Sequence, residues 1–369
     1  MLAGDTLLQQ VNEKRRKTKA ISIGNVPIGG DSPISVQSMT KCETSDRGAV
    51  LDQIRSLATA GCDIIRLAIP DESSARAIER ICKASPIPVV ADIHFDYQLA
   101  LITIAGGVDA VRINPGNMKR ESHVKAVADA AQKAGIPIRI GINSGSLERS
   151  LLKKYGGPTA EAMAESAMMC AKKFEGWGFK DLKLSLKSHD VAETVFAYRK
   201  VAAVCDYPLH LGITATGAGL EAKLKSAVGI GALLIDGIGD TIRVSLSSEP
   251  EEEVVVGLAL LKTLGLHPRG LELVACPTCG RCKVDLLNYL EIVKKGLSGI
   301  QGEISVAVMG CVVNGPGEAR QADIGVAFSD DGTASVFRDG RHYASGPAGE
   351  MLERLIDDAR RLAEERRTQ

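Results

Sequence analysis

The chain has few aromatic residues and no excess of either charge. Its 369 residues include six Phe, six Tyr and one Trp, and 45 Lys and Arg residues are balanced by 45 Asp and Glu residues. Proteins that bind nucleic acid without reading sequence rely on a positive surface potential and on aromatic stacking platforms. The composition therefore disfavours nucleic-acid binding and leaves open a local basic pocket.

Long apolar runs are also lacking. The longest, 227–235 and 254–261, are far shorter than the ~20 residues that a membrane span needs. The first twenty residues contain no apolar segment of the kind that secretory signals carry. We therefore expect a soluble, cytoplasmic protein with no membrane span.

Nine cysteines are present, an odd number, in a chain without a recognisable export signal. This combination disfavours a disulfide framework. Cysteines 42, 62, 82, 170 and 205 stand alone in apolar stretches, which is typical of buried small side chains. The other four fall within 36 residues and need a different explanation.

Short apolar strands alternate with helical segments through most of the chain, after a predicted hairpin over 21–30. Helix-like stretches such as 46–61, 71–85, 121–135 and 190–204 begin at Asp or Glu, and several end at Gly. Eight strands are expected, at 34–39, 64–69, 88–93, 110–113, 138–142, 182–186, 208–213 and 241–246.

Strands that are apolar throughout indicate a parallel sheet buried on both faces. Eight strand–helix units over about 230 residues favour a (β/α)₈ TIM barrel. An open α/β sheet is the weaker alternative, because no GxGxxG follows the first strand. A break near 266–270 then separates residues 1–267, the predicted barrel, from 268–369, a predicted α+β domain with strands at 271–275, 305–309, 324–328 and 334–337.

Basic side chains stand at or near the ends of five predicted strands, where barrel enzymes place their chemistry. The polar residues at these ends are Gln37, Ser38, Arg66, Asp92, His94, Arg112, Asn114, Arg139, Asn143, Lys187, Ser188, His210, Thr214, Arg243 and Ser245. An anionic ligand would neutralise these cations, and the Asn-Pro-Gly turn at 114–116 can present N–H groups to phosphate. Structural ion pairs with neighbouring carboxylates are the alternative.

The clustered cysteines read Cys276-Pro-Thr-Cys279-Gly-Arg-Cys282, with Cys311 following 29 residues later. A zinc ribbon would need a second CxxC pair, so the spacing favours an iron–sulfur centre. Spacing alone predicts an all-cysteine 4Fe–4S cluster. Glu318, seven residues after Cys311, is a candidate oxygen ligand for an exchangeable iron, with a solvated loop carboxylate as the alternative.

Seven motifs resemble one enzyme family over essentially the whole chain. They are SVQSMT (35–40), DIHFD (92–96), RINPGN (112–117), HLGIT (210–214), GIGDTIRVSL (237–246), CPTC (276–279) and GCVVNGPGE (310–318). Together they resemble the 4-hydroxy-3-methylbut-2-enyl diphosphate synthases of non-mevalonate isoprenoid synthesis, in the two-domain form that lacks the plant insert.

The resemblance implies that 2-C-methyl-D-erythritol 2,4-cyclodiphosphate accepts two electrons, loses water and opens to a linear allylic diphosphate. It implies flavodoxin or ferredoxin as electron donor, and a homodimer in which the cluster domain of one chain covers the barrel mouth of the other. It assigns the 4Fe–4S cluster to Cys276, Cys279, Cys311 and Glu318, which leaves Cys282 as a spare thiol. Asn314 matches a residue near the open side of the cluster.

The substrate-binding residues that the resemblance implies are Arg66, Arg112, Asn114, Arg139, Asn143, Lys187, Thr214 and Ser245. One position departs from the family pattern: Ala215 stands where an acidic residue is expected. Glu221 is a candidate to replace it, and the alternative is that the acid is dispensable. The rival interpretations are a pterin-binding barrel enzyme with a structural metal, and a metal-stabilised module that binds RNA.

Overall fold

The computed structural model describes residues 14–118, 120–214, 216–268, 270–300 and 302–367. Its chain divides between His267 and Pro268 into two compact units. The larger unit contains the β/α repeats and the smaller one contains a separate mixed sheet.

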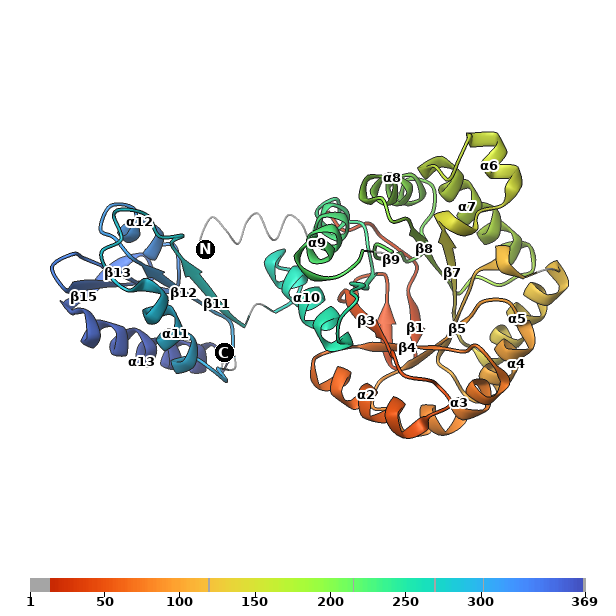
Figure 1. Ribbon diagram of the computed structural model, residues 1–369, viewed down its shortest axis with the longest axis horizontal. Helices are drawn as coiled ribbons and strands as arrows, with labels where there is room; N and C mark the ends of the chain where they lie inside the picture. The colour runs from red at the N-terminus through yellow and green to blue at the C-terminus, as the bar shows by residue number, and fades with distance from the viewer. Residues whose placement is uncertain (1–13, 119, 215, 269, 301, 368–369) are drawn as a thin grey trace. The chain divides into compact units, whose positions relative to one another are not determined.

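The larger unit is a parallel eight-stranded barrel, which confirms the predicted fold class (Figure 1). Its strands are β3 (Ser35–Met39), β4 (Ile64–Ala68), β5 (Val89–Ile93), β6 (Ala110–Ile113), β7 (Ile138–Asn143), β8 (Leu182–Lys187), β9 (His210–Leu211) and β10 (Thr241–Ile242). The sheet order is β8-β7-β6-β5-β4-β3-β10-β9, and a parallel bridge between Leu184 and Leu209 joins its two ends.

Helices surround the strands, as Figure 1 shows. They are α2 (Arg47–Thr59), α3 (Glu72–Ala84), α4 (Tyr97–Ala105), α5 (Glu121–Ala134), α6 (Arg149–Tyr155), α7 (Ala160–Gly176), α8 (Val191–Ala202), α9 (Gly219–Ile235) and α10 (Pro250–Thr263). Short 3₁₀ turns follow β6 and β7, at η1 (Pro115–Asn117) and η2 (Ser144–Ser146).

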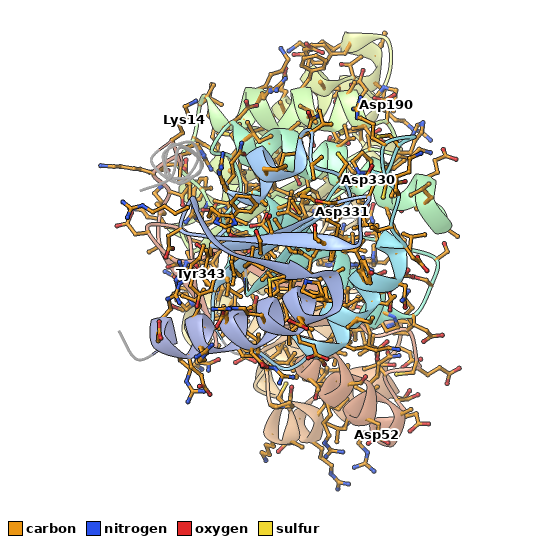
Figure 2. All side chains as sticks on the ribbon, turned by 90° about the vertical axis from the view of Figure 1, so that its left-hand side faces the viewer. Lys14, Asp52, Asp190, Asp330, Asp331 and Tyr343 are labelled. Atoms are coloured by element: carbon orange, nitrogen blue, oxygen red, sulfur yellow. The ribbon has the colours of Figure 1, made fainter. Side chains whose placement is uncertain are left out.

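Several of these helices begin at an aspartate, as the sequence predicts. The side chain of Asp190, labelled in Figure 2, accepts a hydrogen bond from the N–H of Glu193 at 2.8 Å. Asp46 and Asp71 cap α2 and α3 in the same way. Such caps satisfy N–H groups that the first helical turn leaves without partners.

A two-stranded hairpin, β1 (Ile21–Ile23) with β2 (Val26–Ile28), packs against the start of the barrel strands. Its isoleucines form an apolar cluster with Ile64, Val90 and Ala110. Because these three residues lie in the N-terminal parts of β4, β5 and β6, the hairpin forms an apolar floor beneath the barrel interior.

The smaller unit contains a five-stranded sheet in the order β11-β12-β13-β14-β15. Its strands are β11 (Leu271–Ala275), β12 (Ile304–Met309), β13 (Ile324–Phe328), β14 (Thr333–Arg338) and β15 (Arg341–Pro347). The first three strands pair in parallel and the last three antiparallel. The unit is therefore an α+β domain, as predicted.

Helices α11 (Leu286–Gly296) and α13 (Ala348–Arg367) cover one face of this sheet through a core that includes Val293 and Leu355. The short α12 (Gly315–Ala319) packs on the opposite face through Ala319 and Met309 (Figure 1). No helix in the described ranges combines the length and the hydropathy that crossing a bilayer requires.

Candidate active site

The interior of the barrel is lined by polar and charged residues, whereas TIM barrels usually fill this space with branched apolar side chains. Along β7 and β8, Ile138, Ile140 and Leu184 belong to the apolar core, and the residues between them face the interior. The basic side chains gathered there are Arg66, Arg112, Arg139, Lys183, Lys187 and Arg243.

Asp92 on β5 is the hub of this arrangement. Its carboxylate lies 3.0 Å from Nη1 of Arg112 and 3.7 Å from Nε of Arg66. Burial alone would raise the pKa of Asp92, but the neighbouring Arg66, His94 and Arg112 outweigh burial and hold this pKa well below its usual range. Asp92 therefore stays ionised and fixes two guanidinium groups.

Arg139 and Lys187 have no carboxylate within 4 Å in the described part of the chain. Arg139 is bonded through Nη1 to the side-chain oxygen of Gln37 at 3.0 Å, and its Nε has no hydrogen-bond partner there. Burial, followed by the surrounding cations, lowers the pKa values of Arg139 and Lys187 well below their usual ranges. An unpaired buried cation is costly, so both groups fit an anionic ligand in the interior.

Two glycines on the strands make room for these cations. A Cβ atom at Gly141 would lie 2.5 Å from Nε of Arg112, and one at Gly212 would lie 2.6 Å from Nζ of Lys187. Such approaches are far shorter than an ordinary van der Waals contact. Glycine is therefore required at both positions for Arg112 and Lys187 to occupy the places they do.

Four further candidates lie at the same end of the barrel. Asn114 is buried and its amide donates to Ser146 Oγ at 2.7 Å, while its Oδ1 accepts the N–H of Gly116. Asn143 ends β7 and is half-buried. Thr214 and Ser245 follow β9 and β10 and are also half-buried. All eight predicted substrate-binding residues therefore lie on the barrel strands or in the segments that follow their carboxyl ends, and the four basic ones are brought together.

Sequence reasoning missed two groups. Lys183 is buried in the interior and reaches Thr241 Oγ1 at 3.4 Å, and the alternation in LKLSLK is the signal that could have found it. Glu253 on α10 is buried and accepts from Ser38 Oγ at 3.2 Å, with Nη2 of Arg243 at 3.4 Å. Nothing in the sequence of a helix marks such a carboxylate.

Ala215 lies outside the described residues. Glu221, its candidate replacement, is in the first turn of α9 and pairs with Lys225 at 2.7 Å, with 78% of its side chain exposed. The exposed position of Glu221 gives no support to a role in place of the missing acid.

The smaller unit gathers the clustered cysteines in one pocket. Because β11 and β12 pair in parallel, with Ala275 opposite Val308, the loops that follow them lie side by side. These loops form a pocket of about 230 Å³. Its polar and sulfur-bearing lining residues are Cys276, Thr278, Cys279, Arg281, Cys282, Met309, Cys311, Asn314 and Glu318.

Backbone N–H groups surround two of these sulfurs. The N–H of Gly310 donates to Cys276 Sγ at 3.3 Å. The backbone N–H groups of Asn314 and Val313 lower the pKa of the Cys311 thiol. Donors directed at sulfur favour the thiolate, which is the form that binds iron.

Cys282 has a different environment. Its thiol points towards the carbonyl oxygen of Val284 at 3.5 Å and packs beside Leu286. Cys276, Cys279 and Cys311 have no such carbonyl contact in the described ranges.

The donor set of the pocket fits an iron–sulfur cluster. Thiols from two separate loops, a carboxylate and N–H donors to sulfur are the groups that such clusters use. Among the described residues, no three His, Cys, Asp or Glu side chains converge as they would on a single metal ion. The ligands of a cluster bind different iron atoms, so they need not meet at one point.

Two family models match this chain: the GcpE TIM-barrel domain over residues 18–258 and the GcpE protein C-terminal domain over residues 272–361. The chain belongs to the GcpE family. Two GcpE relatives are 4-hydroxy-3-methylbut-2-en-1-yl diphosphate synthases (flavodoxin). The enzyme of Geobacter sulfurreducens is 52% identical to this chain, and the match covers 95% of this chain and 99% of the relative. The enzyme of Cutibacterium acnes is 51% identical, and the match covers 95% of this chain and 92% of the relative.

Among solved structures, a dihydropteroate synthase from Stenotrophomonas maltophilia matches with a TM-score of 0.50 and 12% identity, covering 67% of the GcpE chain and 97% of its own. At this identity the likeness supports the barrel fold alone. The pterin-binding interpretation gains nothing from it, because the GcpE models match both units.

Proposed function

We propose that this GcpE chain is a 4-hydroxy-3-methylbut-2-en-1-yl diphosphate synthase. The reaction converts 2-C-methyl-D-erythritol 2,4-cyclodiphosphate into the linear allylic diphosphate. It consumes two electrons and two protons and releases water. The observation that carries this proposal within the structure is the barrel interior, where Arg139 and Lys187 are buried without carboxylate partners in the described part of the chain. A ligand with two phosphoryl groups supplies the missing negative charge.

The barrel residues bind and orient the diphosphate. Arg66, Arg112, Arg139 and Lys187 donate charge-assisted hydrogen bonds to its oxygens, and guanidinium groups allow bidentate contacts. Asn114, Asn143, Thr214 and Ser245 supply neutral donors and acceptors around the sugar-derived part. Because the strands fix these groups before the ligand arrives, little reorganisation accompanies binding.

Cys276, Cys279, Cys311 and Glu318 are the residues that would hold the 4Fe–4S cluster. When bound, this cluster supplies the two electrons one at a time. Gly310 N–H donates to Cys276 Sγ, and the N–H groups of residues 313 and 314 lower the pKa of the Cys311 thiol. Asn314 lines the same pocket, and in this proposal its amide hydrogen-bonds a ligand that lies beside Glu318.

A reduced flavodoxin is the electron donor that the names of the relatives indicate. We further propose a cytoplasmic homodimer in which the smaller unit of each protomer closes over the partner's barrel. An exposed apolar stripe on α9, formed by Leu220, Leu224 and Val228 at four-residue spacing, supports self-association through the larger unit.

Anaerobic turnover is the test. Protein purified without oxygen is expected to contain about four iron and four sulfide per chain and to convert the cyclodiphosphate when reduced flavodoxin is supplied. Zinc in place of iron, or release of no allylic diphosphate by iron-loaded protein, would defeat the assignment.

A further inference from the structure

His210 on β9 is completely buried, yet neither of its ring nitrogens has a hydrogen-bond partner in the described part of the chain. Its neighbours Leu209 and Leu211 belong to the apolar core outside the strands, so the imidazole faces the barrel interior. The backbone of His210 is fixed, because its carbonyl accepts the hydroxyl of Tyr198. A fixed residue with an unsatisfied buried ring calls for a partner from outside the protein.

Among the described residues, the charged groups that act on the ring most strongly are basic. They come from three strands: Arg66 on β4, Arg139 on β7, and Lys183 and Lys187 on β8. Burial, followed by these cations, lowers the pKa of His210 well below its ordinary value, so the ring is neutral. A neutral imidazole has one nitrogen that accepts a hydrogen bond and one N–H that donates.

The side chains around His210 offer no acceptor to its ring N–H. The neighbouring lysines and arginines are donors only, so they can satisfy the accepting nitrogen and not the N–H. The opposite residue on β10, Thr241, already accepts from Ser35 Oγ at 3.0 Å and lies 3.4 Å from Lys183 Nζ. An acceptor for the N–H must therefore enter with a ligand or with water.

We propose that His210 is a further substrate-binding residue, whose ring N–H donates a hydrogen bond to a phosphate oxygen of the diphosphate held by Arg139 and Lys187. The inference rests on the proposed function, since it takes the diphosphate as the ligand of the barrel. A neutral donor among cations adds direction to the binding without adding charge.

The test is titration calorimetry of anaerobic, full-length holoenzyme with inorganic pyrophosphate, comparing wild type with His210→Phe, His210→Gln and His210→Asn. Loss of a hydrogen bond to a charged group predicts that His210→Phe binds pyrophosphate about 10- to 100-fold more weakly. An amide restores an N–H at the place of one ring nitrogen, Gln near Nε2 and Asn near Nδ1. One of the two amide variants is expected to bind within about threefold of wild type, and the one that does so identifies the donating nitrogen.

Thermal unfolding without added anion separates binding from a structural role. Because the ring makes no hydrogen bond within the protein, His210→Phe is expected to unfold at the wild-type temperature or above it. A large fall in unfolding temperature, with pyrophosphate affinity unchanged in all three variants, would show that the ring binds a structural water and would overturn the proposal. If His210→Phe does not fold, the Gln and Asn variants are compared instead. A difference in pyrophosphate affinity between them supports the proposal, and equal, wild-type affinities in both contradict it.

A pH series with sulfate, whose charge is constant from pH 5.5 to 8, provides a second readout. If His210 stays neutral, sulfate affinity is expected to vary with pH in the same way in wild type and in His210→Gln. A change in affinity near pH 6.5 that occurs only in wild type would contradict the neutral donor. Failure of the proposed function is distinct: wild type would then neither bind pyrophosphate nor convert the cyclodiphosphate. If wild type does both and the variants bind equally, only the role of His210 is wrong.

Discussion

The two units hold their functional side chains in opposite ways. In the larger unit the ligand-binding groups lie on buried strands, where Asp92 and Gln37 fix the guanidinium groups of Arg112 and Arg139. In the smaller unit the thiols lie on loops, and Cys279, Asn314 and Glu318 are exposed. The barrel groups are therefore held by buried partners within the protein, whereas part of the thiol pocket is open to solvent.

Replacing a cluster thiol gives the largest expected effect. Cys311→Ser is expected to lose most of its iron and sulfide and more than about 100-fold in turnover. Its barrel should bind pyrophosphate with wild-type affinity, because the two sites are organised independently. Iron analysis and calorimetry on the same preparation measure both. Cys282→Ser is the matched control and should keep its iron; a loss of iron there would favour the all-cysteine cluster over Glu318.

Removing a buried cation of the barrel is expected to weaken anion binding and to leave the cluster intact. Arg112→Met is expected to weaken pyrophosphate binding about 100-fold, because charge-assisted hydrogen bonds are lost, while the iron content stays at the wild-type value. Unchanged affinity would show that the interior does not bind the diphosphate.

A single added methyl group tests how rigid the barrel is. Gly141→Ala places a Cβ atom 2.5 Å from Nε of Arg112, so this guanidinium must move. We expect pyrophosphate affinity to fall about tenfold, with iron content and fold retained. Gly145→Ala, where a Cβ atom would meet nothing within 4 Å, is the control. Equal affinities in the two variants would mean that Arg112 is not held in place.

The pH dependence of stability gives the smallest effect. In the unfolded chain Lys187 keeps its proton up to about pH 10.4, whereas burial and neighbouring cations lower its pKa in the folded protein. Between these two values the unfolded state binds more protons, so stability without anion rises with pH. As the pH is raised towards about 10, we expect the unfolding temperature to rise more in wild type than in Lys187→Met, measured in buffer without added anion. Parallel curves would contradict this.

Most of the barrel follows from local sequence, because parallel strands and capped helices leave strong patterns. The last two strands are shorter than predicted, at His210–Leu211 and Thr241–Ile242. In the smaller unit β15 was not predicted, because RHYASGP is an exposed edge strand containing Gly and Pro. The short helix α12 was not predicted either, although Pro316 near a helix start is favourable.

The candidate sites could be predicted only in part. Basic residues at strand ends are visible in the sequence, and so is the CxxC pair. The convergence of Cys276 with Cys311 depends on β11 pairing with β12, which no local pattern shows. The unpaired ring of His210 depends on neighbours from three other strands, so only the folded chain reveals it.

The apolar floor made by β1 and β2 has a practical consequence. A barrel closed at one end exchanges its ions through a single opening, so any small oxyanion in a purification buffer competes with substrate for the same cations. Affinities measured in phosphate or sulfate buffers will therefore be too weak, and chloride-based or zwitterionic buffers are the proper reference for comparing variants.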